Sequence, residues 1–183
     1  MAQGTEVADA LALEANEFTR AVSDGATQAE ADVNAFKQEQ AARGLARSGG
    51  VLIGEMEIRF NSIANGPIEK AIAKRKELGR RFPDLLTPDR LNDLRDKLHR
   101  HVDGVLKGQE TRNAMGGGIH GAVLVPLTRQ AQNKASAIKA RIAQDLEALR
   151  LEARLGLRKE ERPMTFNISN NTIASLNLGT VVG

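Results

Sequence analysis

The sequence predicts an all-α protein: an elongated antiparallel bundle of long helices with a short C-terminal β-segment. Three observations support this fold class. An amphipathic pattern covers residues 127–157, shorter helical patterns precede it, and the composition changes abruptly after Pro163. We therefore divide the chain into a helical domain, residues 1–162, and a β-rich tail, residues 163–183.

The amphipathic pattern over residues 127–157 is the longest in the chain. Apolar side chains recur every three or four residues, and Arg, Lys, Gln and Glu fill most of the other positions. The apolar face consists of Leu127, Ala131, Ala135, Ile138, Ile142, Leu146, Leu149 and Ala153. At ~1.5 Å per residue this helix is roughly 45 Å long, so we expect it to form the spine of the domain.

The N-terminal part of the chain predicts two helices separated by glycine. We expect the first to end at Ser23-Asp24-Gly25, because glycine is common at helix C-termini. Residues 27–30 match a capping box, so a second helix is expected to begin there and to run to about Arg47. Ser48-Gly49-Gly50 is the next expected break. The apolar face expected for the first helix is Val7, Leu11, Ala15, Phe18 and Val22.

Residues 51–64 fit two different periods. Met56, Ile58 and Phe60 alternate with charged residues, as in a half-buried strand. The spacing of Met56, Phe60 and Ile63 also fits one face of a helix. We favour the helix because no partner strand is evident nearby.

Prolines mark the next expected helix boundaries. Gly66-Pro67 is expected to separate the preceding helix from one over residues 68–82, since proline suits the first helical position. Thr87-Pro88-Asp89 combines an N-cap residue, a proline and an acid near the positive end of the helix dipole, which predicts a helix start. We expect this helix to end at Gly108 and residues 109–114 to form a polar connection.

Composition excludes several chemistries. The chain has no cysteine, which rules out disulfides, thiolate zinc sites and a cysteine nucleophile. Its longest apolar runs are far too short to cross a bilayer, and the N-terminus lacks the basic-then-apolar pattern of a secretory signal. We therefore expect a cytoplasmic protein with no membrane span.

The net charge of +3 conceals an asymmetry along the chain. Residues 1–40 carry eight acidic and two basic side chains, a net charge of −6, whereas residues 41–183 carry 24 basic and 15 acidic ones, a net charge of +9. We expect the acidic N-terminal helices to pack against the basic remainder of the assembly. Attraction of nucleic acid or anionic lipid by the basic part is the alternative.

The basic segment at residues 70–81 is the best nucleic-acid candidate. Clustered Lys and Arg suffice for phosphate contacts, and Lys70, Lys74 and Arg81 are expected on one helix face. Single-strand binding usually adds aromatic platforms, and this chain has no Tyr or Trp. Nucleic acid is therefore the alternative partner rather than the favoured one.

Two other local patterns point weakly to ligands. The glycine-rich residues 116–121 resemble a phosphate-binding loop, but the GxxxxGK[ST] pattern is missing and a flexible hinge explains them better. His99 and His101 fall on different sides of a helix and cannot share a metal ion. Asp96, His99 and Asp103 do share a face, where intrahelical pairs are the simpler explanation. We expect no catalytic, cofactor or metal site, and hence no enzyme.

The tail from residue 164 to residue 183 contains no charged side chain. Apolar and polar residues alternate on either side of Asn170-Asn171, which predicts two strands joined by a turn. Because a lone hairpin is marginal in water, we expect the strands to pair between copies of the chain. The expected oligomerisation residues are Phe166, Ile168, Ile173, Leu176, Leu178 and Val182.

Residues 167–183, NISNNTIASLNLGTVVG, resemble an ending found on some uncharacterised bacterial helical proteins. The resemblance implies a bacterial or phage-borne origin and a plan of helices followed by a β appendage, and it transfers no functional residue. Taken together, these observations lead us to expect a non-enzymatic, self-associating structural or interaction protein. We expect it to be a homo-oligomer, and a different protein is a further possible partner. A nucleic-acid-binding helical protein is the alternative, and a nucleotide-responsive or hydrolytic enzyme using residues 116–121 comes third.

Overall fold

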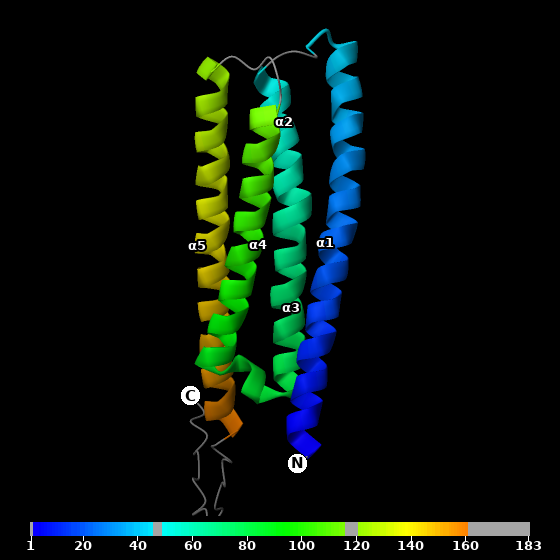
Figure 1. Ribbon diagram of the computed structural model, residues 1–183. Helices are drawn as coiled ribbons and strands as arrows, with labels where there is room; N and C mark the ends of the chain where they lie inside the picture. The colour runs from blue at the N-terminus through cyan, green and yellow to red at the C-terminus, as the bar shows by residue number, and fades with distance from the viewer. Residues whose placement is uncertain (1, 46–48, 116–120, 161–183) are drawn as a thin grey trace, which may run out of the picture.

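The computed structural model describes residues 2–45, 49–115 and 121–160, and the regular elements of this part of the chain are all helical (Figure 1). These elements are α1 (Ala2–Ala42), α2 (Gly49–Arg59), the π-helix η1 (Phe60–Asn65), α3 (Gly66–Arg81), the 3₁₀ helix η2 (Pro83–Leu86), α4 (Pro88–Met115) and α5 (Gly121–Glu160). Since α2, η1 and α3 follow one another as one rod, the described chain forms four rods that run alternately up and down. The predicted all-α antiparallel bundle is confirmed, whereas the predicted β-segment lies outside the described residues.

The main core lies between the α2–η1–α3 rod, α4 and α5. The largest fully buried side chains include Phe60 and Met56 from the rod and Leu98 from α4. From α5, the core receives Leu127, Ala131, Ala135, Ile138, Ile142, Leu146 and Leu149. The predicted apolar face of the spine is therefore confirmed, and α5 extends beyond the predicted range at both ends.

Helix α1 packs along the α2–η1–α3 rod, outside the main core. Its buried apolar side chains are mostly small, namely Ala10, Ala21, Ala29 and Val33. The face predicted for this helix is only partly buried, at Val7, Leu11, Ala15, Phe18 and Val22. Small residues occupy the innermost positions because they let the backbones of two helices approach closely.

The helix end predicted at residues 23–25 is wrong, because α1 continues through it. Gly25 lies where α1 meets η1, and a Cβ atom on it would be only 2.2 Å from the carbonyl oxygen of Ser62. The glycine is therefore needed for a close contact between two backbones rather than for a turn.

The capping box predicted at residues 27–30 is also wrong. Thr27 lies inside α1 and donates its hydroxyl to the carbonyl oxygen of Ser23, 3.2 Å away in the preceding turn. Glu30 does not cap a helix but pairs with Arg59 of α2. An acid at this position thus connects two helices.

The first interruption of the chain comes just after α1. Gly44 has a φ of +73°, a conformation that glycine adopts without strain. The break therefore begins before the predicted one at Ser48-Gly49-Gly50, and Gly49 already starts α2. Residues 51–64 are helical, so the preferred interpretation of that ambiguous segment is confirmed.

The boundary predicted at Gly66-Pro67 coincides with the change from η1 to α3, whose first turn holds Pro67, but the rod continues through the proline without a break. Pro67 has no N–H, so the carbonyl group of Ile63 lacks its usual donor four residues ahead. The backbone widens here into η1, where the N–H of Gly66 donates to the carbonyl oxygen of Asn61. The Nε2 atom of His101 in α4 lies 2.7 Å from the Ile63 oxygen and supplies the missing hydrogen bond.

Helix α4 begins where predicted, at Pro88, but does not end at Gly108. The predicted polar connection, residues 109–114, is helical instead. Gln109 and Asn113 are both buried, and the Gln109 amide donates to the Asn113 oxygen at 2.9 Å. A polar run can therefore continue a helix when two of its side chains bind one another in the interior.

Exchanging Gly25 for alanine tests the contact between α1 and η1. Gly25→Ala should lower stability by about 1–3 kcal/mol, because the new Cβ atom would force two backbones apart. Gly104→Ala is the matched control: it is also helical, but a Cβ atom there meets nothing within 4 Å. The control should raise stability by roughly 0.5–1 kcal/mol. Similar thermal melts of the two variants by circular dichroism would contradict the close contact.

Candidate interaction groove

A groove of about 720 Å³ opens at the end of the bundle where α3, η2, α4 and α5 meet. Its apolar lining comes from Pro83, Leu86, Pro88, Leu149 and Ala153. We call this feature the η2 groove. It is the larger of the two main hollows on the described surface, and apolar atoms dominate its lining.

The groove exists because α5 is longer than its neighbour α4. Pro88, the first residue of α4, lines the groove together with Leu149, and α5 then continues to Glu160 (Figure 1). These last turns of α5 have no α4 residue to pack against. On a different face of the same helix, Leu151 is 46% exposed and Leu155 is 61% exposed.

The wall opposite α5 is set by the proline that ends α3. Phe82 leaves helical geometry at φ −128° and ψ 82°, and the N–H of Leu85 donates to its carbonyl oxygen at 3.0 Å. Leu85 is fully buried, which fixes the short helix η2 on the bundle. Leu86 then lies directly over Gly79, where a Cβ atom would come within 2.5 Å of the leucine side chain.

A buried arginine holds η2 in place from behind. Arg75 of α3 is 3% exposed and forms a bidentate ion pair with Glu14 of α1, at 2.8 and 3.1 Å. Its remaining nitrogen donates to the carbonyl oxygens of Leu85, at 3.2 Å, and Arg90, at 2.9 Å. One guanidinium therefore connects α1, α3, η2 and α4, with its charge balanced by a carboxylate.

The rim of the η2 groove is predominantly basic, with Lys76, Arg80, Arg150 and Arg154 around it. Glu152 is the acid among the lining residues, and its carboxylate lies 2.7 Å from the Lys76 ammonium. The Nε atom of Arg150 is buried and has no hydrogen-bond acceptor among the described residues, although a carboxylate of Glu147 lies 3.1 Å away without hydrogen-bond geometry. A ligand with acceptor groups would therefore find donors here.

The basic segment proposed for nucleic acid does not form one surface. Lys70 and Lys74 line a second groove, of about 450 Å³, between α1 and α3. Lys74 binds the carboxylates of Glu77 and Glu17, and these hydrogen bonds raise the pKa of its ammonium. Arg81 lies apart, with its guanidinium 5.1 Å from the centre of the Phe82 ring.

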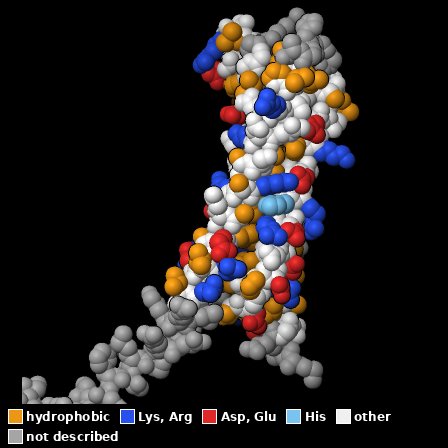
Figure 2. Space-filling model, turned by 90° about the vertical axis from the view of Figure 1, so that its left-hand side faces the viewer, with side chains coloured by type: hydrophobic (Ala, Val, Ile, Leu, Met, Phe, Trp, Pro, Cys, Tyr) orange, Lys and Arg blue, Asp and Glu red, His pale blue; other side chains and the backbone are white. Residues whose placement is uncertain are grey.

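The surroundings of Lys70 and Lys74 disfavour a polyanion. Four carboxylates line the same groove, those of Glu14, Glu17, Asp24 and Glu77. Viewed from the α5 side, the surface likewise carries basic and acidic side chains mixed together (Figure 2). The expectation that the acidic N-terminal segment packs on the basic remainder agrees with the pairs of α1 with α3.

His101 of α4 has a structural role in the described residues. The Nε2 atom of His101 donates a hydrogen bond to the Ile63 carbonyl oxygen of η1. The His101 ring also packs edge-on against Phe18, with ring centres 5.2 Å apart. Asp103, which the sequence placed near His99, pairs with Lys139 of α5 at 2.6 Å. Within the ranges that the structure describes, no three His, Asp or Glu side chains are grouped to hold a metal ion.

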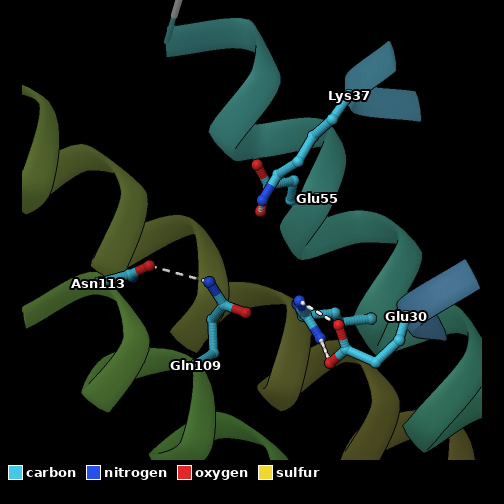
Figure 3. A network of polar contacts seen from close by, with 6 residues as sticks. Glu30, Lys37, Glu55, Gln109 and Asn113 are labelled. Carbon is cyan, nitrogen blue, oxygen red and sulfur yellow. Dashed lines mark hydrogen bonds and ion pairs between the residues drawn. The ribbon is translucent and has the colours of Figure 1, made fainter. Parts of the chain in front are cut away.

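A polar network crosses the other half of the bundle (Figure 3). The guanidinium of Arg59, 7% exposed, donates to both oxygens of Glu30, at 2.6 and 3.3 Å. Next to it, Lys37 and Glu55 pair at 3.1 Å, and the buried amide pair of α4 completes the group. Sequence reasoning missed these residues because the partners are up to 29 residues apart.

The expected oligomerisation residues, all within the tail, lie outside the described residues. So do residues 116–120 of the glycine-rich segment, whereas Gly121 starts α5. Of the described helices, none is long and apolar enough to cross a membrane. Comparisons with protein families, with curated proteins and with solved structures gave no match.

Removing the charge of Glu14 tests the buried ion pair. Glu14→Gln should destabilise the fold by about 3–5 kcal/mol, because it leaves the Arg75 guanidinium buried without a counter-charge. Glu17→Gln removes a half-exposed partner of Lys74 and should cost less than about 1 kcal/mol. Urea unfolding followed by circular dichroism measures both, and equal losses would show that burial does not distinguish the two acids.

The pair between Glu30 and Arg59 should make stability depend on pH. The hydrogen bonds from Arg59 hold the pKa of Glu30 below its ordinary value of 4.5. Because the folded-state pKa is the lower one, the pair stabilises the fold above that pH and loses its effect as the pH falls through the folded-state value. Glu30→Gln should therefore be less stable near neutral pH, by roughly 0.5–1 kcal/mol because the carboxylate is largely exposed.

Urea melts of this variant across acidic pH provide the measurement. The difference from the native chain should shrink as the pH drops below 4.5. Glu39→Gln, which breaks an exposed pair with Arg43 at the end of α1, is the control and should change stability little. A difference for Glu30→Gln that stays constant down to strong acid would contradict the role of this pair.

Proposed function

We propose that the chain is a non-enzymatic, self-associating structural or interaction protein in which the tail joins one copy to another. The observation that carries this proposal is the end of α5. The helix extends past α4 with two exposed leucines, Leu151 and Leu155, and leads directly into the tail. Neighbouring apolar side chains left exposed on a monomer can mark an interaction site.

The composition of the tail supports the same proposal. Residues 164–183 carry six large apolar side chains that we expect to make contacts and no charge. A charge-free segment with β-branched residues needs partners for its backbone groups, and strand pairing between copies is one way to provide them. We propose that this pairing takes the form of a short β-segment.

The arrangement of charges also favours a structural role. Many of the bundle's ionic side chains pair between different helices, as in Lys139 with Asp103 and Arg141 with Glu69. Such exposed pairs link neighbouring helices, each with a small contribution to stability. We place this protein in the cytoplasm, with a bacterial or phage origin, on the strength of its sequence.

Nucleic-acid binding is the alternative function, and less supports it. Lys74 is already bound to two carboxylates, and Lys70 shares its groove with four acids. Counterion release, the main source of affinity for phosphates, needs cations that are free to contact them. Binding at physiological salt that weakens when Lys70, Lys74 and Arg81 are neutralised together would favour this alternative.

Deleting residues 164–183 tests the proposed self-association. The full chain should behave as an oligomer, and the shortened chain should have a lower mass with the same helicity, because the bundle keeps its own core. Light scattering after size exclusion measures the mass, and circular dichroism measures the helicity. An oligomer of unchanged mass would contradict the proposal, and a loss of helicity would show that the tail belongs to the core of the monomer.

A further inference from the structure

We propose that the η2 groove is the receptor for residues 164–183 of a second copy of the chain. This inference rests on the proposed self-association and adds the surface that the tail contacts. Four features of the described residues lead to it: the shape of the groove, its charges, its place on the chain and the exposed leucines nearby.

The shape and lining of the groove suit apolar side chains. Leu86, Leu149 and Ala153 give it an apolar floor, and its volume of about 720 Å³ falls in the range of pockets that enclose a ligand of several side chains. Gly156 adds open space, since a Cβ atom on it would meet nothing within 4 Å. Large apolar residues of the tail, such as Phe166, fit this environment.

The charges of the groove suit a segment without cations. Four basic side chains surround it against one acid, so a basic segment would be repelled. The tail brings no charge, and its backbone carbonyl groups are hydrogen-bond acceptors for the arginines of the rim.

The groove and the tail are also close in the chain. Helix α5 lines the groove as far as Gly156 and ends, within the described residues, at Glu160. An extended segment spans ~3.3 Å per residue, so the tail reaches several tens of ångströms from that point. When two copies meet at this end, each tail is therefore within reach of the other copy's groove at high effective concentration.

The exposed leucines argue for a second copy rather than for a tail folded back on its own groove. Leu151 and Leu155 do not line the groove: they lie about 200° around the helix from its apolar residues Leu149 and Ala153, beside the rim residues Arg154 and Glu152. A tail in its own groove would leave both leucines in water. A second copy would cover both the groove and the two leucines of α5. In a two-fold arrangement, the tail of each copy would bind the groove of the other.

Thiol cross-linking tests which chain fills the groove. The sequence has no cysteine, so each introduced thiol is unique. Chains with Ala153→Cys in the groove and differently tagged chains with Ile168→Cys in the tail are mixed and treated with a short thiol cross-linker. We expect a cross-linked product carrying both tags. Ala137→Cys, exposed on α5 away from the groove, replaces Ala153→Cys as the control and should give no such product.

Filling the groove provides a second test. Gly156→Trp should weaken self-association at least tenfold, since the indole would occupy the space meant for the tail, while Gly104→Trp, at an equally open helical glycine, should not. Circular dichroism confirms that both variants fold. The groove assignment is overturned if Gly156→Trp leaves association unchanged, if the groove and tail thiols do not cross-link, or if they cross-link only within a doubly substituted chain. In each case a lower mass on deleting the tail would still uphold self-association, whereas an unchanged mass would defeat it.

Discussion

The bundle depends most on the guanidinium group of Arg75. A charge this deeply buried is costly unless a counter-charge and hydrogen-bond acceptors surround it, and Arg75 obtains these from three other elements at once. Helix α1 must therefore place Glu14 beside α3 while η2 and α4 present their carbonyl groups from the opposite direction. The end of the bundle that carries the η2 groove is thus held in one arrangement, and the wall formed by Leu86 is present before any partner arrives.

Local sequence patterns correctly predicted helices whose buried face can be recognised from the spacing of apolar residues within that one helix. The spine is the best example, since seven of its eight predicted inward residues, Ile142 among them, are buried, and the eighth, Ala153, is partly buried. The chain stays helical through both Gly25 and Pro67, where breaks were expected, for a shared physical reason. Glycine also permits close contact between helices, and a proline can be accommodated by a π-helical turn when a side chain such as His101 supplies the missing donor. Both compensations come from residues far away in sequence.

The same reason explains what sequence reasoning found and missed at the candidate site. The positions of Lys70, Lys74 and Arg81 on a helix were predictable, but their partners were not, because Glu17 comes from a different helix. The η2 groove is built from four segments of the chain, so no single segment predicts it. One feature of the sequence does point to it: the apolar face of α5 continues to Ala153, and Gly156 follows, beyond the part of α5 that α4 covers. The role of the tail residues stays a prediction.

Together, these features describe a bundle with one preformed end, at which we propose that a second copy binds. Hydrogen exchange of the unmodified chain, measured well above and well below the concentration at which it associates, tests this claim most directly. Association should slow exchange in η2 and the residue that follows it, residues 83–87, and in the tail, residues 164–183, while the opposite end around residues 109–115 stays unchanged. Slower exchange confined to that opposite end, or no concentration dependence at all, would contradict the account.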